Sequence, residues 1–238
     1  MKLSILALLC ILLSSEVTAQ STLNNLDPRI LRGNQPLMPR GNNEIEIKGH
    51  PFSTDEWQSG SIILQDSSRS EDLKLKFKLN VEDSEIWVLS PDKTERILTD
   101  TRIAGLILIR LDTIVEYRKF LLPEETSPRF AQVIHNGKNF TLIKYQKKTF
   151  VKANYTDKGL VVVGNKYDTF ESVEAYYLLS QNKKGMKINL SKGDILKATA
   201  SVSRPKREEI LQYCKENDIR NPLNEEDAIL MLTYIDGL

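Results

Sequence analysis

The chain has 238 residues, and its 33 lysines and arginines nearly balance its 32 aspartates and glutamates. A formal net charge of +1 gives no broad basic field, so we expect no nucleic-acid partner. Of the two cysteines, Cys10 falls in a predicted signal peptide, so Cys214 alone remains and no internal disulfide can form. A chain of this length can bury a sizeable core without one.

Residues 1–19 have the pattern of a secretory signal peptide. A lysine opens the segment, Leu3–Leu13 are mostly apolar, and small residues precede Gln20. The apolar run is shorter than the roughly 20 residues that a membrane-spanning helix needs. Lipidation of Cys10 is a less favoured alternative, because no small residue precedes it. We expect cleavage near Ala19–Gln20 and an exported protein, periplasmic or extracellular, without a transmembrane segment.

Residues 20–43 hold three prolines and two glycines among asparagine and glutamine, with no apolar period. This composition is typical of a flexible N-terminal arm.

Apolar and polar side chains alternate from residue 44 onward, which predicts antiparallel strands with one face on the core. Residues 72–80, DLKLKFKLN, are the clearest case, with lysines on one face. Residues 103–111, IAGLILIRL, are apolar on both faces and predict a covered central strand, although the run also fits a buried helical turn or two. Asn136-Gly137 predicts a hairpin turn, because both residues tolerate positive φ.

The chain changes to a helical period at about residue 191. Ser191 with Asp194 predicts one helix start, and Asn224 with Asp227 predicts another. Two apolar stripes are predicted in the last two helices, one formed by Ile210, Leu211, Tyr213 and Cys214 and the other by Ile229, Leu230, Leu232 and Ile235.

The predicted fold is α+β and mainly β. We expect an antiparallel sheet or meander over residues 44–190, sandwich- or barrel-like, with a short helical C-terminal segment. That segment, residues 191–238, should pack its apolar faces on the sheet.

Three stretches resemble an uncharacterised family of exported β-rich proteins from Bacteroidota-type bacteria. They are GHPFSTDEWQSGSIIL at 49–64, NGKNFTLIKYQKK at 136–148 and EAYYLLSQNKKGMKINLSKGDIL at 174–196. The chain departs from that family at residues 103–120, where a plainer aromatic strand is expected. The resemblance implies an exported protein with a helical C-terminus and no established activity.

The stretch 49–64 contains His50, Asp55 and Glu56, which together suggest a metal site. Neighbouring Asp55 and Glu56 would point to opposite sides of an extended segment, and zinc usually takes two or more His or Cys ligands. We therefore predict no metal and no cofactor.

The same stretch is better explained as the corner where a sheet begins. Phe52 and Trp57 would cover an open sheet edge, and Gly60 would permit a turn or bulge before the strand.

Catalytic signatures are weak along the whole chain, so no catalytic residue is predicted. No Gly-x-Ser-x-Gly elbow occurs, and Cys214 lies on an apolar stripe where a cysteine usually acts as a small hydrophobe. The alternative is a hydrolase-like enzyme acting on an envelope polymer with carboxylates from residues 50–56.

Candidate ligand-binding residues are Lys144, Lys147, Lys148 and Tyr177. Lysines of this kind attract an anionic glycan or lipid surface by charge, but they are also the usual solvated face of a sheet and guard its edges. The expected function is that of an exported, non-enzymatic envelope protein, a binding or assembly module. Its partner would be another envelope protein or an anionic glycan or lipid surface.

Overall fold

The computed structural model describes residues 47–70, 74–111, 113–157, 162–180 and 185–238. The predicted signal peptide and N-terminal arm lie outside these residues. No helix of the described chain is long and apolar enough to cross a bilayer.

The described chain is mainly β and ends in helices, which confirms the predicted fold class. The strands are β1 (Ile47–Lys48), β2 (Ser59–Leu64), β3 (Arg69–Ser70), β4 (Lys76–Asn80), β5 (Glu85–Leu89), β6 (Glu95–Leu98), β7 (Ile103–Arg110), β8 (Thr113–Phe120), β9 (Arg129–Asn136), β10 (Phe140–Val151), β11 (Thr156–Asp157), β12 (Val162–Val163), β13 (Asp168–Ser180) and β14 (Gly185–Ile188). The helices are α1 (Lys192–Ala198), α2 (Ala200–Ser203), α3 (Arg207–Glu216) and α4 (Glu225–Asp236).

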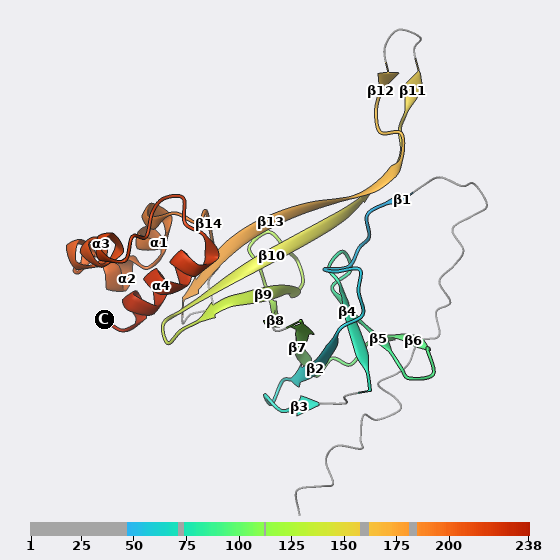
Figure 1. The fold of residues 1–238 in the computed structure, drawn as a ribbon, viewed down its shortest axis with the longest axis horizontal. Coiled ribbons are helices and arrows are strands. Elements are labelled where there is room, and N and C mark those ends of the chain that lie inside the picture. Colours follow the sequence, from blue (N-terminus) through green and yellow to red (C-terminus); the bar gives the residue numbers. More distant parts are fainter. Residues whose placement is uncertain (1–46, 71–73, 112, 158–161, 181–184) are drawn as a thin grey trace, which may run out of the picture.

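One long, twisted sheet runs through the molecule (Figure 1). Its strand order is β1-β13-β10-β9-β8-β7-β2-β3, with β14 also paired to β13. The described sheet is open, with β3 at one end and β1 and β14 at the other. It is antiparallel except for the two-residue pair of β1 with β13, which is parallel. Gly49 follows β1 with a φ of 79°, a left-handed conformation that glycine adopts readily.

A small sheet, β4-β5-β6, packs on the part of the long sheet formed by β2, β7 and β8. Phe77 and Leu79 of β4 share a buried cluster with Leu106 and Leu108 of β7. These side chains alternate with lysines in β4, as predicted. The strand predicted at residues 103–111 is confirmed, because β7 pairs with β2 on one side and β8 on the other.

The helices cover one face of the opposite end of the long sheet. Leu142 of β10 and Leu178 of β13 share a second buried cluster with side chains from α1, α3 and α4. Both predicted helix starts are confirmed: Ser191 Oγ accepts a hydrogen bond from the Asp194 N–H at 3.1 Å, and Asn224 does the same for the Asp227 N–H at 2.7 Å.

The predicted helical stripes need two corrections. Leu211 of α3 and Leu230 of α4 are exposed rather than buried. In α4 the buried positions are Ala228, Met231, Leu232 and Ile235. This spacing of i, i+3, i+4 and i+7 is the one that places side chains on a single helix face.

Strands β10 and β13 form a long ribbon that joins the two ends of the molecule (Figure 1). They pair directly, from Phe140 with Ser180 to Val151 with Thr169. Beyond the ribbon, β11 and β12 pair in a small projecting hairpin.

Candidate functional site

The three candidate lysines of β10 already contact protein oxygens. Lys144 Nζ lies 3.0 Å from Glu174 and 3.3 Å from Glu225. Burial opposes its charge, but the hydrogen bond to Glu174 and the charge of Glu225 raise the pKa of Lys144 above its usual value. Lys147 Nζ lies 3.0 Å from a carboxylate oxygen of Glu125.

Lys148 is turned toward the opening stretch. Its ammonium donates to the backbone carbonyls of His50, at 3.0 Å, and Phe52. Burial lowers the pKa of Lys148. Ligand binding at these lysines stays a prediction, but each ammonium group already serves a contact within the fold.

Tyr177 lies in the core, only 3 % exposed, and its hydroxyl donates to Glu124 at 2.8 Å. Burial and that hydrogen bond raise the pKa of Tyr177. Ligand binding at Tyr177 stays a prediction, but this ring faces the buried cluster of Leu122, Ile143 and Leu179 and not the solvent. Its neighbour Tyr176 faces the other way and donates to Glu225.

The opening stretch forms the predicted corner. Phe52 and Gln58 make antiparallel bridges to Asn80 and Phe77, so residues 52–58 line the edge of the small sheet before the chain continues into β2.

The candidate metal ligands of this corner do not converge. Asp55 lies 3.6 Å from Lys78, and His50 Nδ1 lies 3.5 Å from Lys148 Nζ. Within the described ranges no group of three His, Cys, Asp or Glu side chains could hold a metal ion.

Gly60 has a role other than the predicted turn or bulge. A Cβ there would lie 2.1 Å from the carbonyl oxygen of Ile107, so glycine allows β2 and β7 to approach closely. The bulge of β2 lies instead between Ile63 and Leu64.

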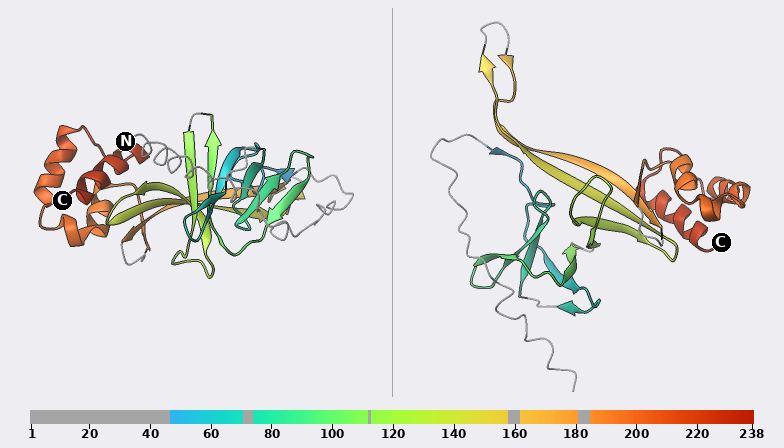
Figure 2. Two further views of the ribbon diagram at one scale, coloured as in Figure 1. Left: turned by 90° about the horizontal axis from the view of Figure 1, so that it is seen from below. Right: turned by 180° about the vertical axis from the view of Figure 1, so that it is seen from behind.

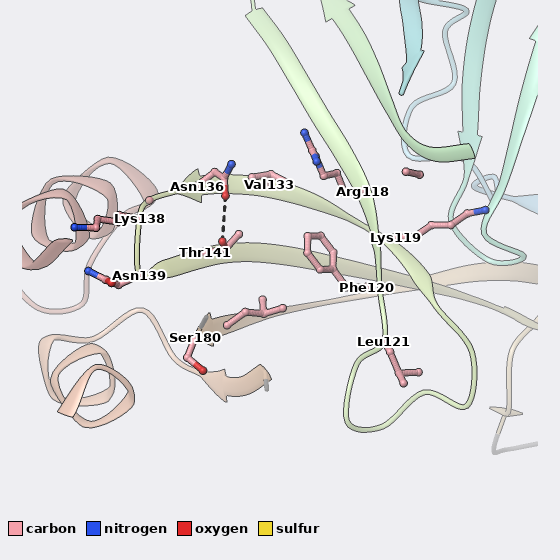
Figure 3. A pocket seen from close by; sticks show the side chains of 13 residues that line it. Arg118, Lys119, Phe120, Leu121, Val133, Asn136, Lys138, Asn139, Thr141 and Ser180 are labelled. Atoms are coloured by element: carbon pink, nitrogen blue, oxygen red, sulfur yellow. Dashed lines mark hydrogen bonds between the residues drawn. The ribbon is translucent and has the colours of Figure 1, made fainter. Parts of the chain in front are cut away.

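A pocket forms where β9 exchanges one partner strand for another. Gln132 of β9 pairs both with Tyr117 of β8 and with Lys144 of β10. Residues of β9 before Gln132 pair with β8, and residues after it pair with β10. The β9–β10 turn therefore diverges from β8. The pocket has a volume of about 460 Å³, within the usual range for ligand sites (Figure 3). It is lined by Ala104, Arg118, Lys119, Phe120, Leu121, Val133, Asn136, Gly137, Lys138, Asn139, Thr141, Leu179 and Ser180.

The lining combines apolar surface with hydrogen-bond donors and positive charge. Phe120, Val133 and Leu179 supply apolar surface, and Lys138 stands at the rim on the β9–β10 turn (Figure 3). Arg118 contacts Glu116, outside the lining. Among the residues that the structure describes, the lining contains no carboxylate.

Lys119 contributes its backbone and stem rather than its charge to the pocket. Figure 3 shows its side chain turned away from Phe120. Its ammonium lies 5.1 Å from the ring centroid of Phe130, and burial lowers the pKa of Lys119. Arg118 and Lys138 are the other cationic residues of the described lining, and Figure 3 shows the Lys138 side chain on the outer side of the β9–β10 turn.

The turn that forms one wall of the pocket is held by the last helix. Asp236 of α4 accepts a hydrogen bond from the Asn139 N–H at 2.9 Å, and its other oxygen lies 3.2 Å from His135 Nε2. Thr141 Oγ1 donates to Asn136 Oδ1 at 3.1 Å (Figure 3). The β9–β10 turn, which forms the polar wall of the pocket, is therefore held both by Asp236 of α4 and by the Thr141–Asn136 hydrogen bond.

No known protein family matches the chain, and no curated protein or solved structure is significantly similar to it. The pocket residues were missed by sequence reasoning, which placed the candidate site further along β10. The only local signal was Lys138 in the predicted Asn-Gly turn.

Proposed function

We propose that this protein is an exported, non-enzymatic binding or assembly module, and that the pocket receives an acidic group of a partner protein. One observation carries the proposal: the pocket pairs apolar surface with Arg118 and Lys138, and the described part of its lining has no carboxylate. Charge-assisted hydrogen bonds to a carboxylate are stronger than neutral ones, and the apolar part would bury a neighbouring side chain.

The best-fitting partner group is a carboxylate beside an aliphatic side chain. Phe120 and Val133 offer the aliphatic part a surface, while Asn136 and Thr141 hold each other in position at the polar wall. Preorganised donors of this kind favour binding, because little order must be gained when the partner arrives.

A dipeptide probe tests the proposal. N-acetyl-leucyl-aspartate amide should shift the backbone NMR signals of Asn139 and Thr141, with a dissociation constant of about 1 mM or below. The neutral leucyl-asparagine analogue should bind at least about fivefold more weakly, because it lacks the charge. Added salt should weaken binding of the acidic probe.

Lys138→Gln should reduce affinity for the acidic probe by about three- to tenfold. Lys215→Gln, an exposed lysine of α3, is the matched control and should leave affinity unchanged. Equal binding of both probes, or equal affinity of the Lys138 and Lys215 variants, would contradict the proposal.

A further inference from the structure

The tip of the β7–β8 hairpin carries three exposed aliphatic side chains. Leu111 is 99 % exposed, Ile114 71 % and Ile109 46 %. Ile109 and Ile114 are cross-strand partners, so their side chains lie together just below the tip. The left view of Figure 2 shows this hairpin, in light green, standing out from the body of the molecule.

This exposure departs from the expectation that residues 103–111 are covered on both faces. The middle of β7 is buried, but Ile109 is exposed and Arg110 is only half-buried. Exposed aliphatic side chains grouped at one place usually mark an interaction surface.

The pocket lies at the other end of the same hairpin. Arg118 and Phe120 belong to the last part of β8, and Leu121, 63 % exposed, follows directly. Five positions along β8, from Thr113 to Arg118, separate the tip from the first pocket residue of the strand, a distance of about 17 Å. A copy therefore cannot place its own tip in its own pocket, whereas a neighbouring copy can.

Resting on the proposed function, we propose that the β7–β8 tip of one copy docks into the pocket of the next. Leu111 and Ile114 match the apolar lining. The sequence also places an aspartate, Asp112, between Leu111 and Thr113. An acidic residue beside aliphatic ones is the chemistry that Lys138 and Arg118 with an apolar surface would receive.

The same chemistry favours a second copy over a lipid bilayer. An aspartate that follows an aliphatic residue in the sequence opposes insertion of the tip into hydrocarbon. The cations of the pocket, in contrast, attract that aspartate. Because the tip and the pocket are different surfaces, the contact is heterologous and propagates head to tail. A contact of three or four residues is well below the ~800 Å² per partner of a stable complex, so the association is weak and reversible.

Sedimentation velocity of the purified protein, from about 5 to 500 µM, tests this inference. The weight-average sedimentation coefficient of the wild type should rise with concentration. Two variants should each abolish this rise in the sedimentation coefficient. Leu111→Ser removes the apolar contact of the tip, and Lys138→Glu places a negative charge in the pocket that repels the acidic tip. Leu230→Ser, an exposed leucine of α4, is the matched control and should behave as wild type.

Mixing the two disabled variants gives the sharpest result. Leu111→Ser keeps an intact pocket and Lys138→Glu keeps an intact tip, so an equimolar mixture should form dimers and no larger species. A wild type that stays monomeric over the whole range, or a mixture that stays monomeric while the wild type associates, would overturn the inference.

Two further outcomes separate this inference from the proposed function. If the acidic dipeptide binds the pocket but the wild type stays monomeric, the inference fails and the proposed function stands. If neither binding nor association is seen, both fail. Monomeric wild type that binds phosphatidylglycerol vesicles through Leu111 would assign the tip to a lipid surface instead.

Discussion

Lys148 shows how a single side chain joins two distant parts of this fold. Its ammonium reaches from the β10–β13 ribbon to the backbone carbonyls of His50 and Phe52, nearly 100 positions earlier in the chain. Hydrogen bonds from a charged donor are stronger than neutral ones, so this contact stabilises the opening stretch against the ribbon. It also places a positive charge beside the ring of His50.

Protonation of His50 should therefore oppose folding. Burial, and then the charge of Lys148, lower the pKa of His50 below its ordinary value of 6.5. Above that value the ring is neutral in both the folded and the unfolded chain, and its contribution to stability is fully present. As the pH falls, the unfolded chain takes up the proton first, so stability is lost.

Urea unfolding of wild type and His50→Gln between about pH 8 and pH 5 checks this prediction. The free energy of unfolding of the wild type should fall relative to the variant as the pH decreases through this window. A difference that stays constant, or that grows in favour of the wild type at low pH, would contradict it.

At the scale of elements, the end of α4 contacts the β9–β10 turn beside Gly137, where a side chain would clash. A Cβ on Gly137 would lie 1.6 Å from Asp236 Oδ2 and 2.6 Å from His135 Nε2. Gly137→Ala should therefore displace Asp236 from both His135 and the Asn139 N–H. We expect the free energy of unfolding to fall by about 1–3 kcal/mol, the range for breaking a half-buried charged hydrogen bond.

Amide hydrogen exchange provides the direct measurement for this element. The Asn139 N–H, which loses its acceptor, should exchange faster in Gly137→Ala. Gly185→Ala is the control, because the nearest atoms to a Cβ there lie 3.8 Å away. The effect of Gly137→Ala should largely vanish in an Asp236→Ala background; an undiminished effect would mean that Asp236 is not the group displaced.

These elements also mark the limit of sequence reasoning. The caps at Ser191 and Asn224 were predictable, because each depends on residues within a few positions of one another. The hairpin at Asn136-Gly137 was predicted too, but for the wrong reason: Asn136 ends β9, residues 137–139 make the turn, and neither Asn136 nor Gly137 has a positive φ. The pocket was not, because it depends on the partner exchange at Gln132 and on Asp236, which lies 97 positions from Asn139. The exposed hairpin tip was missed for a similar reason, since an apolar run does not show where its covering sheet ends.

At the scale of the whole molecule, two buried clusters stabilise opposite ends of one sheet. The first joins the small sheet to β2, β7 and β8, and the second joins the helices to β9, β10, β13 and β14. The two clusters have no residue in common. They are linked through the sheet itself and through a smaller cluster around Ile143 and Tyr177 on its other face. Damage to one end should therefore spread to the other only partly.

Leu232→Ala tests this division. Leu232 is fully buried among the helices, so its truncation should cost about 2–5 kcal/mol. The two tryptophans of the chain, Trp57 and Trp87, lie at the other end and report on the small sheet, whereas far-ultraviolet circular dichroism reports mainly on the helices. In urea, the dichroism midpoint of this variant should fall well below the fluorescence midpoint.

Val88→Ala in β5 is the converse variant and should lower the fluorescence midpoint more than the dichroism midpoint, because Val88 belongs to the first cluster. Coincident transitions that shift together in both variants would instead mean that the long sheet unfolds as one cooperative unit. In that case the ribbon of β10 and β13 would couple the two ends more strongly than their separate clusters imply. The walls of the pocket belong to strands on either side of the point where β9 changes its pairing from β8 to β10. A destabilising change at either end would then also alter the pocket.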